Sequence, residues 1–125
     1  MEAQKPTVDQ VLQMMTQSMD GKLPKSIELA KEVFPEIIVE QALNSAYAMP
    51  QENGALDAET RILIYLGIAL ATGSKTCIEA MMNKSKTLRI NKDKILETFK
   101  IARYAESSRV LGNADLVFEQ LIDEK

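Results

Sequence analysis

The sequence contains no histidine and only one cysteine, Cys77. Histidine is the one side chain whose unperturbed charge change falls near neutral pH. Its absence excludes a Ser-His-Asp triad, a Cys-His pair and every histidine-ligated metal site. A single cysteine also excludes an internal disulfide, which agrees with a reducing compartment. Any chemistry in this chain must therefore use one thiol, carboxylates, lysines or tyrosines, and we expect no metal and no cofactor.

Long apolar runs and an excess of positive charge are absent too. The longest apolar run, residues 62–71, is about half of the roughly 20 residues that a membrane-spanning helix needs. Residues 1–6 lack the apolar region of a signal peptide, so we expect a cytoplasmic protein that does not enter a membrane. The formal net charge of −3 offers no basic field for a phosphate backbone, which argues against nucleic-acid binding.

The chain has the size and the apolar content of one folded domain. It has 125 residues, 46% of them hydrophobic, which is enough to build a core. Apolar positions recur at spacings of three and four residues, and no segment alternates as a strand would, so the pattern predicts an all-α fold of six or seven helices. The expected helices run from Thr7 to about Met19, from Pro24 to Val33, from Pro35 to about Met49, from Asp57 to Ala71, from Ser74 to about Leu88, from Asn91 to before Glu106, and over Val110 to Leu121.

The same periodicity indicates which side chains face inward. In the first helix these are Val8, Val11, Leu12, Met15 and Met19, in the second Ile27, Ala30 and Val33, in the third Ile38, Ala42, Leu43, Ala46 and Tyr47, and in the sixth Ile95, Leu96, Phe99 and Ala102. Residues 62–71 are all apolar or glycine, so that helix should be buried on nearly all sides. In so small a domain, such burial suggests contacts between subunits.

The middle of the chain carries a specific order of features. A capped helix start at Leu56-Asp57-Ala58-Glu59-Thr60-Arg61 precedes the apolar helix, and Thr72-Gly73-Ser74-Lys75-Thr76-Cys77-Ile78-Glu79-Ala80-Met81 follows it. The order continues through Ile90-Asn91-Lys92-Asp93-Lys94-Ile95-Leu96-Glu97. It resembles the carboxymuconolactone decarboxylase family, which includes the alkylhydroperoxidase D-like proteins. The resemblance covers residues 34–125 as a family-like core, with residues 1–33 as N-terminal helices of the same single domain. It implies a homo-oligomer, commonly a hexamer built as a trimer of dimers.

The resemblance also assigns positions to the family's redox site. Its redox-active branch has a glutamate on the apolar helix, a Cys-x-x-Cys pair at the next helix start and a histidine one turn later. These positions fall on Ile62, on Ser74 with Cys77, and on Met81. Only Cys77 keeps the family's chemistry, so the other three are site positions with altered side chains.

Two classes of function follow. In the first, Cys77 is a reactive thiol in the first turn of a helix, where the helix dipole favours a thiolate. It reacts with a peroxide or a disulfide, and an external thiol resolves it, since the alcohol of Ser74 cannot form a disulfide. In the second, the protein is a noncatalytic oligomer that is structural or binds a small molecule in an apolar pocket, and Cys77 is an ordinary buried residue.

A lyase reaction like that of the family's decarboxylase branch is a further possibility for an enzyme. The resemblance implies acid-base chemistry on an anionic lactone, and this chemistry depends on histidine. Arg61, Arg103 and Arg109 can in principle bind a carboxylate, but such residues are more often surface or salt-bridge groups. We expect Met81 and Met82 to pack in the core, and Glu79 to face solvent because it lies on a different helical face from Cys77.

Overall fold

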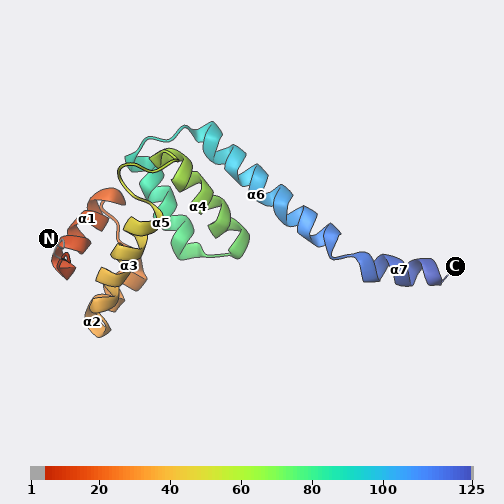
Figure 1. The fold of residues 1–125 in the computed structure, drawn as a ribbon, viewed down its shortest axis with the longest axis horizontal. Coiled ribbons are helices and arrows are strands. Elements are labelled where there is room, and N and C mark those ends of the chain that lie inside the picture. The colour runs from red at the N-terminus through yellow and green to blue at the C-terminus, as the bar shows by residue number, and fades with distance from the viewer. Residues whose placement is uncertain (1–4, 125) are drawn as a thin grey trace.

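The computed structural model describes residues 5–124, which form seven helices and no strand. The all-α prediction is confirmed. Residues 1–4, on which part of the signal-peptide expectation rests, lie outside the described residues. The helices are α1 (Val8–Ser18), α2 (Lys25–Val33), α3 (Glu36–Ala48), α4 (Ala58–Thr72), α5 (Lys75–Thr87), α6 (Lys92–Gly112) and α7 (Asp115–Asp123) (Figure 1).

Most helix starts lie where the sequence places them, because short-range side-chain hydrogen bonds fix them. Thr7 caps α1 through a reciprocal pair of hydrogen bonds with Gln10. The Asp57 carboxylate accepts from the backbone N–H of Thr60 at 2.7 Å and starts α4. Gly73 ends α4 with φ +75°, a left-handed conformation that glycine adopts without strain.

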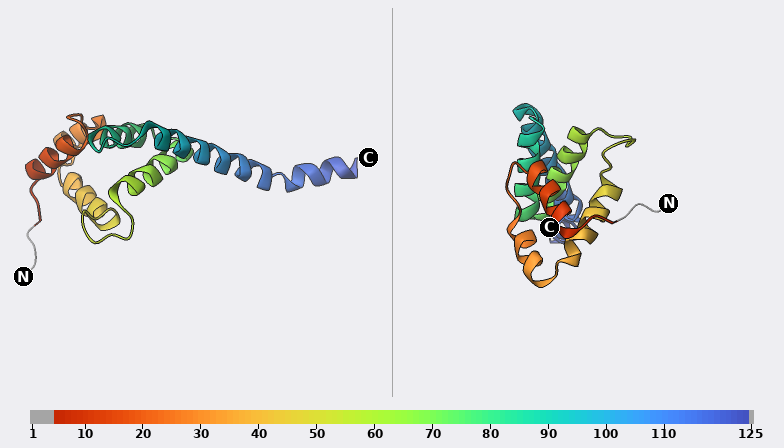
Figure 2. Two further views of the ribbon diagram at one scale, coloured as in Figure 1. Left: turned by 90° about the horizontal axis from the view of Figure 1, so that it is seen from above. Right: turned by 90° about the vertical axis from the view of Figure 1, so that its left-hand side faces the viewer.

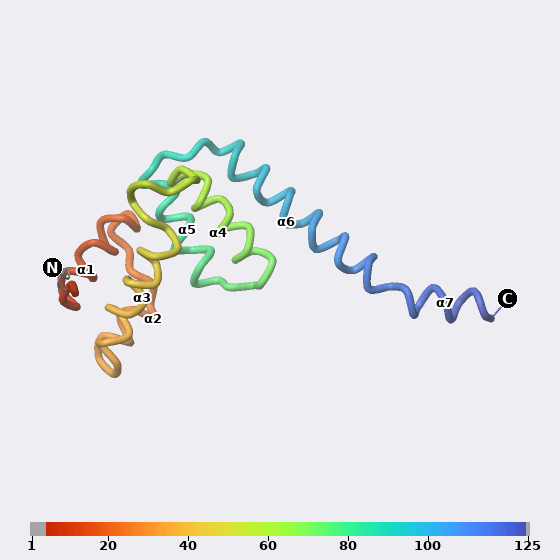
Figure 3. Tube along the Cα trace, viewed as in Figure 1, coloured from red at the N-terminus to blue at the C-terminus, as the bar shows by residue number. Residues whose placement is uncertain are grey.

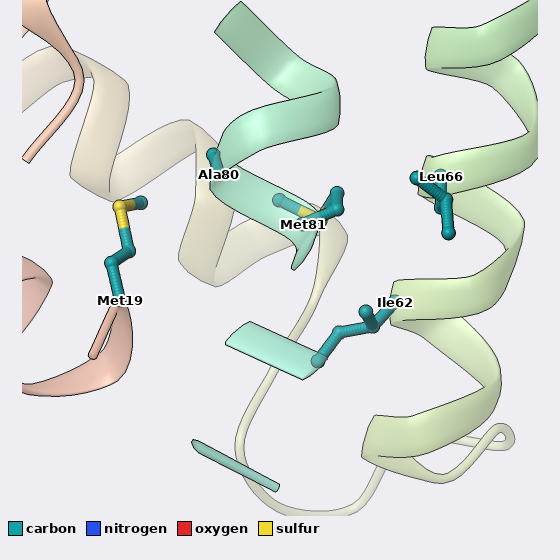
Figure 4. Packing of buried hydrophobic residues seen from close by; sticks show 5 residues of the cluster. All are labelled: Met19, Ile62, Leu66, Ala80 and Met81. Atoms are coloured by element: carbon teal, nitrogen blue, oxygen red, sulfur yellow. The ribbon is translucent and has the colours of Figure 1, made fainter. Parts of the chain in front are cut away.

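The core lies between α1, α4 and α5. Its main cluster has five buried side chains, which come from the C-cap of α1, from α4 and from α5 (Figure 4): Met19, Ile62, Leu66, Ala80 and Met81. A second contact joins α1 to α3, where Val11 and Ile38 are 2% and 0% exposed. The prediction for the first helix is confirmed, since Val11 and Met19 are buried and Val8, Leu12 and Met15 are half-buried.

The predicted break at Glu106-Ser107-Ser108 is wrong, because α6 runs through it to Gly112. This stretch contains no glycine or proline, and glutamate and serine are tolerated inside a helix. One turn of it is held by an ion pair, in which Arg109 Nε donates to Glu106 Oε2 at 2.9 Å. The helix ends instead at Gly112, with Asn113 as its C-cap, and α7 starts at Asp115.

The C-terminal helices project from the rest of the chain. The start of α6 lies beside α4, where Lys94 and Glu59 form an ion pair at 3.2 Å. Farther along, α6 leaves the body of the molecule, and α7 continues in the same general direction (Figures 2 and 3). We call α6 beyond residue 98 together with α7 the C-terminal arm. No helix among residues 5–124 has the length and apolarity to cross a bilayer.

Several side chains expected to face inward are exposed in the single chain. Tyr47 and Val33 are 90% and 83% exposed, and Ala46 is also exposed. Leu43, Leu96 and Phe99 are 37%, 45% and 49% exposed, whereas Ile95 and Ala102 are half-buried. These expectations are wrong for one chain, because helical periodicity identifies an apolar face but not whether the same chain covers it.

Helix α4 is likewise buried on one side only within the chain. Ile62, Leu66 and Ala69 pack into the core, but Ile64 and Ile68 are 47% and 58% exposed. The expected burial on nearly all sides is therefore not met by this chain alone.

Candidate functional site

Cys77 lies in the first turn of α5, as its spacing from Ser74 predicts. Ser74 is the N-cap, and its hydroxyl oxygen accepts from the backbone N–H of Cys77 at 3.4 Å. The thiol is free and half-buried, so it is neither in the core nor fully in water. At this place the unpaired N–H groups and the positive end of the helix dipole favour an anion.

A second residue, Tyr65 of α4, contacts the thiol. Its hydroxyl oxygen lies 3.3 Å from Cys77 Sγ, within hydrogen-bond distance for a sulfur partner. Sequence reasoning misses this contact because Tyr65 lies inside the apolar run, whose pattern predicts a helix buried on nearly all sides. One signal was present, since Tyr65 has the only side chain in residues 62–71 that can form a hydrogen bond.

The two groups shift each other's pKa in opposite directions. Hydrogen bonds from Ser74 and then from Tyr65 hold the pKa of the Cys77 thiol below its usual value, against the smaller opposing effect of burial. The hydrogen bond to Cys77, followed by burial, raises the pKa of the Tyr65 phenol. The thiol therefore ionises first, and the phenol keeps its proton and donates it in a hydrogen bond to the thiolate.

Ile62 and Met81 lie together in the core cluster, on facing helices (Figure 4). They are 5% and 3% exposed, and both pack in the cluster that contains Leu66. Cys77 precedes Met81 by one turn of α5, and Tyr65 follows Ile62 by one turn of α4. Since neither Ile62 nor Met81 can take up a proton, these two positions supply no general base to the thiol.

The other candidate residues have different surroundings. Glu79 is exposed, as expected, and Met82 is half-buried against the core. Arg61 donates to the backbone carbonyls of Pro50 and Leu56, so it holds the loop before α4. Arg109 pairs with Glu106, and Arg103 lines a hollow on α6 together with Phe99, to which Arg61 does not contribute. Among residues 5–124, the three arginines thus have separate partners or surroundings, which gives no support to a common carboxylate site.

We expect Tyr65→Phe to raise the pKa of Cys77 towards its ordinary value, because the ring remains but the donor to the thiolate is lost. The pH profile of Cys77 alkylation by iodoacetamide should move to higher pH, and the rate at neutral pH should fall severalfold. Tyr47→Phe is the matched control, since Tyr47 is 90% exposed. Identical profiles for Tyr65→Phe and the wild type would show that the phenol does not act on the thiol.

Comparison with protein-family models matches residues 39–119 to the model described as "Carboxymuconolactone decarboxylase family". The match runs from α3 into α7 and includes both Tyr65 and Cys77. A search of curated proteins finds no match.

Proposed function

This chain belongs to the carboxymuconolactone decarboxylase family, and we propose that it is a single-cysteine, thiol-dependent peroxidase with Cys77 as its nucleophile. The observation that carries the proposal is the 3.3 Å contact between Tyr65 Oη and Cys77 Sγ at a capped helix N-terminus. A thiolate in this position is stabilised by two hydroxyl groups and by the helix dipole. Its partial exposure leaves the sulfur open to a small oxidant.

The proposed cycle has three balanced steps. The Cys77 sulfur attacks one oxygen of a hydroperoxide, the O–O bond breaks, and the products are a sulfenic acid on Cys77 and an alcohol that carries the thiol's proton. An external thiol then forms a mixed disulfide with Cys77 and releases water. A second external thiol cleaves that disulfide, which returns the Cys77 thiol and leaves the reductant as its own disulfide.

The external reductant is required by what surrounds Cys77. The chain has no second cysteine, and the group three residues before Cys77 is the alcohol of Ser74. With Ile62 and Met81 in the core, no acid or base stands at the family's relay positions. We therefore expect turnover with a dithiol reductant to be far below that of family members with the full Cys-x-x-Cys pair.

Three observations favour this proposal over the alternatives. Cys77 is half-buried rather than packed in the core, unlike a structural cysteine. The Ile62 and Met81 side chains pack in one cluster, which leaves little support for an apolar ligand pocket at those positions. A decarboxylase-like lyase would rely on histidine, of which the chain has none.

We expect Cys77→Ser to abolish hydroperoxide consumption that depends on an added monothiol, because the hydroxyl of serine is not a nucleophile of comparable strength. The measurement follows loss of hydroperoxide with time for the wild type, Cys77→Ser and the control Ser18→Ala, whose exposed side chain lies on α1. Consumption that persists unchanged in Cys77→Ser would contradict the proposal. A wild type without activity would favour the noncatalytic alternative.

We also propose that the chain functions as a homo-oligomer, with a hexamer as the expected assembly. The exposed Ile64 and Ile68 of α4 and the exposed apolar side chains of the C-terminal arm support association. Light scattering should give a multimer at micromolar concentration, whereas a monodisperse monomer would contradict this part of the proposal.

A further inference from the structure

The corner between α2 and α3 carries exposed apolar side chains. Val33 at the end of α2, Phe34 at the turn and Ile37 in the first turn of α3 are 83%, 49% and 39% exposed. Leu29, one turn before Val33, is 56% exposed. We call these four residues the corner patch. Figures 1 and 3 show the corner at the far end of the molecule from the C-terminal arm, so the arm of the same chain does not cover it.

Helix α2 gains little burial from the rest of the chain. It packs against α3, yet none of its nine residues is buried. Ile27 and Ala30 are half-buried, whereas Leu29 and Val33 lie on another side of the helix and are exposed. Most of the stability of a short helix in a protein comes from packing of its apolar side chains. A partner on the side of Leu29 and Val33 would therefore supply burial that residues 5–124 do not.

Negative charge surrounds the corner patch. Four glutamates lie on the same two helices, all of them exposed: Glu28, Glu32, Glu36 and Glu40. Among residues 5–124, none of the four forms an ion pair. The only cations of residues 25–40 are two lysines, so this stretch has a net charge of −2. An apolar centre with a charged rim is the usual composition of a protein interface, and the sign of this rim favours a basic partner.

The corner patch is separate from the surfaces that support association of copies. The family match begins at residue 39, so all four patch residues lie outside it. In an isologous contact the same surface faces itself, and the glutamates of one copy would then meet those of the other. Helix α7 is also acidic and apolar, but its exposed side chains belong to the arm that supports the homo-oligomer. The patch therefore fits a molecule of opposite charge better than a second copy.

We propose that the corner patch binds a basic amphipathic helix of another protein. The apolar side chains of that helix pack on Leu29, Val33, Phe34 and Ile37, and its lysines and arginines meet the surrounding glutamates. A helix is the fitting element because its apolar side chains recur on one face, with positive charge available on both flanks. This function is additional to the peroxidase and is independent of the chemistry of Cys77.

A synthetic peptide of the stated chemistry tests the surface with the full chain. The probe is a labelled peptide of about 18 residues, long enough to form a helix, with leucines on one face and lysines elsewhere. One control peptide has glutamate in place of each lysine, and a second has the leucines and lysines in scrambled order. Fluorescence anisotropy at low salt should show that the probe binds about tenfold or more tightly than either control.

Substitutions in the patch locate the binding. We expect Leu29→Ser with Val33→Ser to weaken binding of the probe by about tenfold, because apolar contact area is lost. Glu28→Gln with Glu32→Gln should weaken it by a similar factor at low salt and reduce its dependence on ionic strength. All four side chains are exposed, so neither variant disturbs the core.

Matched substitutions on α7 are the control for general attraction to an acidic, apolar helix. Leu116→Ser with Ile122→Ser removes two side chains that are 65% and 66% exposed, and Asp115→Asn with Glu119→Gln removes two charges. Both variants should bind the probe as the wild type does.

Four results would overturn the proposal. They are absence of binding by the probe, equal affinity for the three peptides, binding that the patch variants leave unchanged, and binding that the α7 variants weaken as much as the patch variants. Light scattering on the Leu29→Ser, Val33→Ser variant adds a fifth test. A smaller assembly than that of the wild type would show that the patch joins copies of this chain, whereas the proposal predicts an unchanged mass.

Discussion

Replacement of Leu66 by aspartate should leave the chain largely unfolded. Leu66 is 2% exposed and lies in the cluster with Met19, Ile62 and Met81. Loss of the leucine side chain alone costs about 2–5 kcal/mol when the cavity cannot collapse. The new carboxylate adds the cost of burying a charge with no cation beside it. Small domains are stable by only about 5–15 kcal/mol, so the sum removes most of the free energy of unfolding.

Leu29→Asp is the matched control for this change. Leu29 is 56% exposed on α2, so the same substitution places the carboxylate in water and should change stability little. Helical content by circular dichroism and the urea midpoint measure both variants. A Leu66→Asp chain that keeps the midpoint of the wild type would mean that α4 does not pack on α5 as described.

Restoration of the family's site should give the second large effect. In the triple variant Ser74→Cys, Met81→His, Ile62→Glu, two thiols stand at the start of α5, and an acid and a base enter the cluster between α4 and α5. We expect the thiols to form a disulfide under mild oxidation. Because a positioned general acid or base contributes about 10²–10⁴-fold, dithiol-dependent peroxide reduction should rise on the order of 10²-fold over the wild type.

The triple variant has a cost in stability that a simpler variant avoids. Ile62 and Met81 are 5% and 3% exposed, so the introduced glutamate and histidine must hydrogen-bond to each other to offset the loss of solvation. Ser74→Cys alone changes only the half-buried N-cap and should still form the disulfide with Cys77. A folded Ser74→Cys chain whose two thiols stay separately titratable under oxidant would show that positions 74 and 77 are not the family's cysteine pair.

The helix starts could be predicted from sequence because their causes are local. The caps at Thr7, Asp57, Ser74 and Asn91 each accept from a backbone N–H two or three residues ahead. The position of Cys77 in the first turn of α5 follows from the Ser74 cap alone. Short-range patterns therefore predict these four helix starts and the position of Cys77, which is half of the candidate site.

The contact of Tyr65 with Cys77 could not be predicted, because it depends on how α4 packs against α5. The two residues are twelve apart in sequence, and no pattern gives the rotation of one helix relative to the other. The exposure of Tyr47 was missed for a related reason. An apolar face is visible in the sequence, but whether the same chain or a second copy covers it is decided by tertiary and quaternary packing.

The most direct test measures the alkylation rate of Cys77 against pH in the folded wild type. The same rate is then measured for the chain in denaturant, and the comparison shows whether the fold activates this thiol. Ser74 and Tyr65 lower its pKa only in the folded state, and the thiolate is the species that reacts with iodoacetamide. We predict faster alkylation of the folded chain at neutral pH and a profile shifted to lower pH than in denaturant. A folded chain that reacts more slowly than the denatured one, with its profile at the same or higher pH, would contradict a catalytic thiol at position 77.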